Sequence, residues 1–132
     1  MKRKTKIILF GIILVIVSMV SLLVLLINKL DSDVEVILNE VIIEVDLSTI
    51  EDGVYNGEYT KALAVSSEVE VTIQNNRITN IEIIKHINGQ GGPAEVIIND
   101  IMEYQSLLVD DIAGATYSSR VLKLSIQDAL KE

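Results

Sequence analysis

The sequence contains no cysteine and no tryptophan, and it has a single histidine. The lack of cysteine excludes disulfides, thiol chemistry, iron–sulfur clusters ligated by cysteine, and an N-terminal cysteine modified by lipid. A lone histidine leaves no pattern typical of a zinc site, and it fixes no geometry for a serine–histidine–acid triad. The sequence therefore shows neither a metal site nor a nucleophilic triad.

Basic residues are scarce beyond the N-terminus. Five of the eleven lysines and arginines precede Asp31, where there is no acidic residue, and the remaining chain carries six basic and nineteen acidic residues. An acidic domain is repelled by phosphate backbones and by anionic lipid. We therefore expect no nucleic-acid partner, and we interpret the acidity as a device that keeps an exported domain soluble.

Charge is absent from Ile7 to Ile27, which consists almost entirely of large apolar residues. Twenty-one helical residues span roughly 31 Å, the thickness of the hydrocarbon core of a bilayer. Basic residues cluster before this run, between Lys2 and Lys6, and only Lys29 follows it closely. The positive-inside rule then places the N-terminus in the cytoplasm and the remaining chain outside. We predict a single-pass anchor in the cell membrane. A cleaved signal peptide is the alternative, and the length of the run and the lack of a small-x-small cleavage site argue against it.

The sequence divides into three parts. Residues 1–28 form the basic cytoplasmic tail and the transmembrane anchor, residues 29–51 an amphipathic stalk, and residues 52–132 a folded domain. Within the stalk, apolar residues from Val34 to Val45 recur at helical spacing with glutamates between them, which predicts an amphipathic helix. We expect this helix to pack on its own domain.

The first half of the folded domain has the pattern of a β-meander. Strands are expected over Val54–Tyr59, over the alternating residues Glu68–Ile73, and around Ile81 and Ile83. Asn75-Asn76 supplies a hairpin turn, because asparagine tolerates a positive φ. The pattern predicts an antiparallel sheet.

The sequence of the second half of the domain predicts two helices. Pro93 fits the first position of one helix, and the last helix follows the Gly114-Ala115-Thr116 turn. Apolar stripes mark the buried faces, with Ala94, Ile97, Ile98, Ile101 and Leu108 in the first and Val121, Leu122, Ala129 and Leu130 in the second. We predict an α+β fold, an antiparallel β-meander followed by two helices, preceded by a single transmembrane helix and a short stalk.

The start of the last helix is the strongest candidate for a binding site. A helix start offers unpaired N–H groups and the positive end of the macrodipole, so it suits a phosphate. Gly114 permits a tight turn, and the small Ala115 leaves the hydroxyl of Thr116 accessible. Ser118, Ser119 and the first-turn N–H groups are candidate partners for phosphate oxygens. The alternative is that Thr116 or Ser118 is an ordinary N-cap.

Two motifs resemble those of the FMN-binding domain family, which includes the flavin subunits of sodium-pumping and ferredoxin-linked respiratory complexes. Asp52–Tyr59 resembles the opening Asp-Gly-x-Tyr-x-Gly, and Asp110–Thr116 resembles the flavinylation signal Asp-x-x-Ser/Thr-Gly-Ala-Thr. The chain departs from this signal at Ala113, where the family has serine or threonine. The resemblance covers roughly Asp52 to Leu130.

This resemblance implies a covalent cofactor. Thr116 would be joined to the phosphate of FMN by a phosphodiester bond, which a separate magnesium-dependent flavin transferase makes with FAD as donor. Asp110 would serve recognition by the transferase or its metal, or else only a local turn hydrogen bond. The domain would then be a redox carrier rather than a stand-alone enzyme, with redox partners in the membrane or outside the cytoplasm.

Other residues are candidates for contact with the flavin. His86 precedes a glycine-rich loop, where it would contact the isoalloxazine or manage protons, unless it is a surface histidine without function. Gly91 would allow a close backbone approach to the cofactor, or would only make the connection flexible. Tyr117 is preferred as a stacking face over Tyr104 and Tyr59, because it neighbours Thr116.

Three hypotheses about function remain open on this sequence. The first is a membrane-anchored electron carrier with covalent FMN. The second is a module that binds FMN without a covalent bond and loses it on denaturation. The third is a membrane-anchored structural or assembly protein with an empty site, which the loss of a hydroxyl at Ala113 keeps open.

Overall fold

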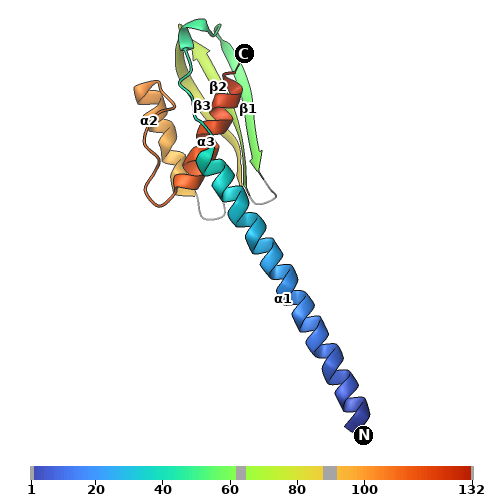
Figure 1. Ribbon diagram of the computed structural model, residues 1–132. Coiled ribbons are helices and arrows are strands. Elements are labelled where there is room, and N and C mark those ends of the chain that lie inside the picture. Colours follow the sequence, from blue (N-terminus) through green and yellow to red (C-terminus); the bar gives the residue numbers. More distant parts are fainter. Residues whose placement is uncertain (1, 62–64, 88–91, 132) are drawn as a thin grey trace. The chain divides into compact units, whose positions relative to one another are not determined.

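The structure is a computed structural model that describes residues 2–61, 65–87 and 92–131. It consists of two compact units divided between Val34 and Glu35. The first unit is formed by the greater part of helix α1 (Lys2–Asn39). The second unit holds the end of α1, a sheet and the remaining helices (Figure 1).

Helix α1 has the properties of a membrane-spanning segment. Among the described residues, it is the one helix long and apolar enough to cross a bilayer. No part of its most apolar stretch is buried within the structure, and Phe10, for example, is 70% exposed. A continuous apolar surface of this kind requires lipid or a partner to cover it. The helix therefore supports the predicted single-pass anchor.

The sheet is a three-stranded antiparallel meander in the order β1-β2-β3. Its strands are β1 (Gly53–Lys61), β2 (Val65–Gln74) and β3 (Arg77–Ile87). Asn75 and Asn76 connect β2 to β3 with φ values of 51° and 59°, the positive values that a two-residue type I′ hairpin requires. The predicted hairpin is confirmed.

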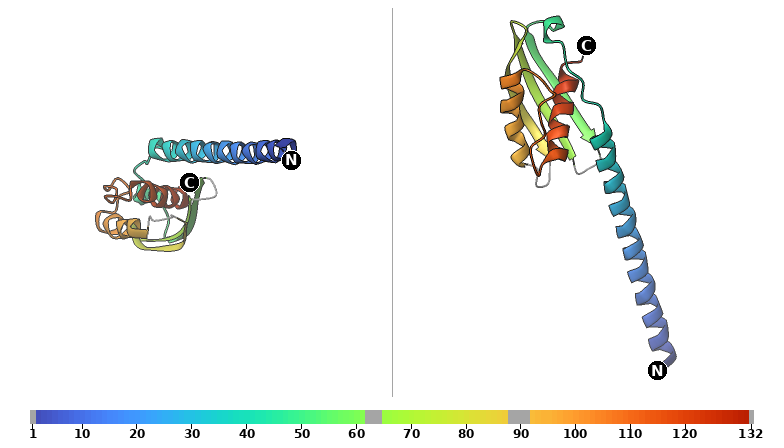
Figure 2. Two further views of the ribbon diagram at one scale, coloured as in Figure 1. Left: turned by 90° about the horizontal axis from the view of Figure 1, so that it is seen from below. Right: turned by 60° about the vertical axis from the view of Figure 1, so that its left-hand side comes forward.

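Helices α2 and α3 cover one face of this sheet (Figures 1 and 2). Helix α3 (Thr116–Ala129) packs on β1 and β2, and helix α2 (Ile97–Tyr104) packs on β3. Two 3-10 helices, η1 (Leu47–Thr49) and η2 (Gly92–Val96), lie in the connections, and η2 packs against α3. The core between the layers includes Val69, Val71, Ile73, Ile97, Ile101, Leu122 and Ile126, all fully buried. The α+β prediction is confirmed.

The segment that follows the apolar stretch of α1 is fastened to this core, as expected. Ile37 is fully buried against Val65, Val121 and Leu124. Burying a side chain of this size contributes about 1.5–3 kcal/mol. Arg120 on α3 donates hydrogen bonds to the carbonyls of Ile37 (3.1 Å) and Glu40. A cation at these last carbonyls also compensates the negative end of the helix dipole.

The helix expected from Val34 to Val45 ends early, at Asn39. Residues 41–45 include four β-branched residues, which lose side-chain freedom in a helix. The side chain of Gln127 accepts a hydrogen bond from the backbone N–H of Ile43 at 2.7 Å, so the extended segment is held by α3. Tertiary contacts therefore override the helical spacing of the apolar residues.

The prediction of the apolar stripe on helix α2 is wrong at one position. Leu108 is 60% exposed, whereas its neighbour Leu107 is 2% exposed and belongs to the core. Helix α2 ends at Tyr104, and Gln105 adopts a left-handed conformation with a φ of 54°. The helical period does not continue past this point, so spacing counted from Ile97 no longer identifies the buried face.

Candidate functional site

The start of α3 presents Thr116 to solvent. Ala115 occupies the N-cap position with a φ of −137°, and it makes no side-chain capping bond. The N–H of Ala115 donates to the carbonyl of Ile112, and the carbonyl of Ala115 accepts the N–H of Ser119, each at 2.9 Å. Thr116 is the first helical residue, and its side chain is exposed. The alternative that Thr116 or Ser118 is the N-cap is therefore wrong.

A glycine turn leads into this helix. Gly114 has a φ of 77°, in the left-handed region that L side chains rarely adopt. A Cβ atom at this position would meet no atom of the described residues within 4 Å, so conformation rather than space requires the glycine. Ala113 and Gly114 are both exposed. The turn thus leaves open space beside the positive end of α3.

The loop before the turn is fastened to α3 by two side chains that the sequence analysis did not single out. Lys123 Nζ donates to the carbonyl of Val109 at 2.6 Å. Asp111 Oδ1 lies 2.7 Å from the same nitrogen, as an ion pair whose direction is poor for a hydrogen bond. Ser119 and Lys123 are four residues apart and therefore lie on one face of α3, but this spacing does not indicate which loop residues they contact.

Ser118 and Ser119 are both buried. The hydroxyl of Ser119 accepts the N–H of Ile112 at 3.0 Å, so it also fastens the loop. Thr116 is consequently the exposed one of the three residues with a hydroxyl in this helical turn.

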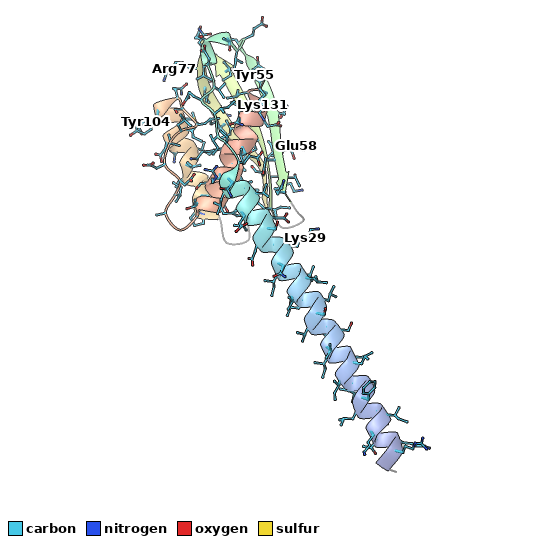
Figure 3. The ribbon with its side chains drawn as sticks, viewed as in Figure 1. Lys29, Tyr55, Glu58, Arg77, Tyr104 and Lys131 are labelled. Atoms are coloured by element: carbon cyan, nitrogen blue, oxygen red, sulfur yellow. The ribbon has the colours of Figure 1, made fainter. Side chains whose placement is uncertain are left out.

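The three candidate tyrosines have different surroundings. Tyr117 is partly buried and packs against the cluster of Ile37, Val65 and neighbouring residues. Tyr104 is 67% exposed and projects away from α2 (Figure 3). Tyr59 donates a hydrogen bond to Glu40 Oε2 at 2.6 Å. Tyr117 remains the tyrosine nearest in sequence to Thr116, and its stacking on a flavin stays a prediction.

The environment of Tyr59 predicts sensitivity to alkaline pH. Burial and the hydrogen bond to Glu40, together with the charge of Glu40, raise the pKa of the Tyr59 phenol well above its ordinary value. The folded state thus retains a proton that an unfolded tyrosine loses near pH 10. This contribution to stability is complete below about pH 10 and is lost as the pH rises beyond it. We expect the melting temperature of the full chain in detergent to fall less steeply above pH 10 in Tyr59→Phe than in the parent. The exposed Tyr104→Phe should behave as the parent, and equal slopes for all three proteins would contradict this assignment.

The side chain of His86 is only 2% exposed, the residue as a whole is partly buried, and its contact with a flavin stays a prediction. It lies near the end of β3, opposite Ser67 of β2, and its Nδ1 is 3.1 Å from Glu95 Oε1 in η2. Because η2 packs on α3, His86 is linked to the helix that carries Thr116. Gly91, the other candidate in this region, lies outside the described residues.

Asp110 is exposed and borders an open depression of about 490 Å³. The depression lies between α2 and the loop before α3, and it is lined by Asp100, Tyr104, Ser106, Leu108, Val109 and Asp110. The carboxylate of Asp110 is therefore accessible to a partner, unlike that of Asp111, which is paired with Lys123.

The domain is thus a small α+β fold in which the exposed Thr116 stands at the start of a helix, after a tight glycine turn. Residues 65–131, about half of the chain, match the family model described as the FMN-binding domain. The chain belongs to this family, and FMN is the cofactor that membership indicates. No curated protein and no solved structure matches the chain.

The stretch Asp52–Tyr59, which resembles Asp-Gly-x-Tyr-x-Gly, precedes the residues matched by the family model. Its side chains make contacts that stabilise the fold. Asp52 Oδ1 accepts the N–H of Asn75 at 2.8 Å, which fixes β1 to the β2–β3 turn. The hydroxyl of Tyr55 donates to the carbonyl of Glu51 at 2.8 Å, and Gly57 packs against α3. Tyr55 shares a surface hollow with Leu130, at the C-terminal end of α3. These residues support the fold at the end of the domain away from Thr116.

Proposed function

We propose that this protein is a membrane-anchored electron carrier that holds FMN through a phosphodiester bond at Thr116, outside the cytoplasm. The observation that carries the proposal is the exposed Thr116 at the first position of α3, beside a cap that offers no side-chain hydrogen bond. Membership of the FMN-binding domain family supplies the identity of the cofactor.

The residues at the start of α3 fit the phosphate of FMN. The positive end of a 14-residue helix favours an anion, and the open space at Gly114 leaves room for it. The flavin, when bound, supplies the redox chemistry, and the protein supplies attachment and orientation. Helix α3 holds Thr116 at a fixed point on the domain, because the helix is buried along most of its length against the sheet.

The attachment requires a flavin transferase and FAD, as the resemblance of the Asp110–Thr116 segment implies. A bond forms between Thr116 Oγ and the phosphorus of the FMN moiety, and the phosphoanhydride bond of FAD breaks. AMP leaves with the electrons of that bond, and a base of the transferase takes the hydroxyl proton. The accessible carboxylate of Asp110 is available to the transferase or its magnesium ion.

The location is supported by the charge of the chain. Basic residues before the apolar stretch favour retention of the N-terminus in the cytoplasm, so the acidic domain lies outside. A domain confined near the membrane meets membrane redox partners at a raised effective concentration. Electrons would pass between such a partner and an acceptor outside the cytoplasm.

The full chain, produced together with a magnesium-dependent flavin transferase and purified in detergent, tests this proposal. We expect a yellow protein whose flavin fluorescence stays with the polypeptide on a denaturing gel, and whose intact mass is increased by one FMN unit. Flavin that is released on denaturation would overturn the covalent bond and favour a non-covalent FMN module. A colourless protein of unchanged mass would overturn the carrier function.

A further inference from the structure

Lys123 is a buried cation that has no role in the proposed function as described above. It lies in the middle of α3, and its side chain is only 5% exposed. An ammonium group is costly to bury unless it is paired and hydrogen-bonded. The two contacts of Lys123, to Asp111 and to the carbonyl of Val109, therefore explain how the charge is tolerated.

The contacts of Lys123 and Ser119 lie on one side of the loop that precedes α3. Val109 and Asp111 are held by Lys123, and the N–H of Ile112 is held by Ser119. The residues between and after these points, Asp110 and Ala113–Gly114, are exposed. The loop is thus bound to α3 along its inner side, and its outer side faces solvent.

We propose that Lys123 and Asp111 are positioning residues for the transfer of FMN to Thr116. They hold the loop so that Asp110 and Thr116 are presented to the transferase in one fixed relation. This inference rests on the proposed function. A preorganised acceptor reacts faster than a mobile one, because the entropy of orientation is lost before the encounter, and small displacements of reacting groups slow reactions strongly.

The test is the rate of FMN transfer to the full chain in detergent, with purified transferase, FAD and Mg²⁺. Initial rates of fluorescence bound to the polypeptide give kcat/KM for each variant, at a temperature where all are folded. We expect Lys123→Met to lower kcat/KM by roughly 10- to 100-fold. Lys123→Arg should recover most of the rate, since it retains the charge and the reach to Asp111. The exposed Lys131→Met, whose residue lies just beyond the end of α3 (Figure 3), is the matched control and should react as the parent.

The double variant Asp111→Asn with Lys123→Met separates positioning from stability. Removing both charges leaves no unpaired ion, so the melting temperature should return towards that of the parent. The loop nevertheless lacks its fastening, so the transfer should stay slow. A parental rate in Lys123→Met, or recovery of the rate together with the melting temperature in the double variant, would overturn the inference. Failure of the parent itself to acquire covalent FMN would instead overturn the proposed function.

Discussion

Replacement of Thr116 by valine is expected to abolish covalent FMN and to leave the fold unchanged. Valine retains the shape of threonine but has no hydroxyl to form the ester. Because the side chain is exposed and Ala115 is the N-cap, the free energy of unfolding should change by less than about 0.5 kcal/mol. Intact mass and fluorescence on a denaturing gel, after production with the transferase, measure the outcome.

Thr116→Ser is the matched control, since it retains an acceptor hydroxyl at the same helical position and should still be modified. The neighbouring hydroxyls cannot replace that of Thr116 in the valine variant, because Ser118 and Ser119 are buried at 3% and 0% exposure. Equal amounts of covalent flavin in the valine variant and the parent would remove Thr116 from its proposed role.

The chain departs from the flavinylation signal at Ala113, and the structure indicates what this departure leaves intact. Ala113 is exposed, and the loop before it is held by Lys123 and Ser119 rather than by a hydroxyl at position 113. The backbone from Ile112 to Ala115 closes on itself by a hydrogen bond of 2.9 Å. The shape of the loop that leads to Thr116 is therefore independent of the missing hydroxyl.

Local patterns in the sequence were sufficient to predict the sheet, the apolar part of α1 and the start of α3. The alternation of apolar and polar residues identified β2, and the uncharged run identified α1. The pair Asn75-Asn76 identified the hairpin, because asparagine tolerates a positive φ. Each of these signals depends on residues close together in the chain, and each arises from backbone geometry or solvation. The helix start at Thr116 belongs to the same class, because Gly114 marks it.

Contacts between distant residues could not be predicted in this way. The end of α1 at Asn39 depends on Arg120 and Gln127 of α3, more than 80 residues away. The pairing of Lys123 with Asp111 depends on how the loop folds back on the helix. A lysine within a helical segment usually indicates a solvated face, so composition alone assigns Lys123 to the wrong environment.

Gly57→Ala is expected to destabilise the domain strongly. A Cβ atom at position 57 would lie 2.1 Å from the carbonyl oxygen of Ser125 and 2.3 Å from the backbone nitrogen of Ala129. Both are backbone atoms of α3, so no side-chain rotation relieves the clash, and the helix must move away from β1. Overpacking of this kind costs about 3 kcal/mol. The melting temperature should fall by roughly 12–24 °C, since each kcal/mol shifts it by about 4–8 °C in a domain of this size.

Gly53→Ala in the same strand is the matched control. The nearest atoms to a Cβ at position 53 would belong to the Tyr55 side chain, at 3.4–3.5 Å, which is ordinary van der Waals contact. Both substitutions reduce the freedom of the unfolded chain equally, so their difference measures the contact with α3 alone. Thermal unfolding of the two full-length variants in detergent provides this comparison. Equal melting temperatures would contradict the close packing of β1 on α3. A lower melting temperature in Gly57→Ala alone would instead show that α3, the helix carrying Thr116, can lie this close to the sheet because position 57 has no side chain.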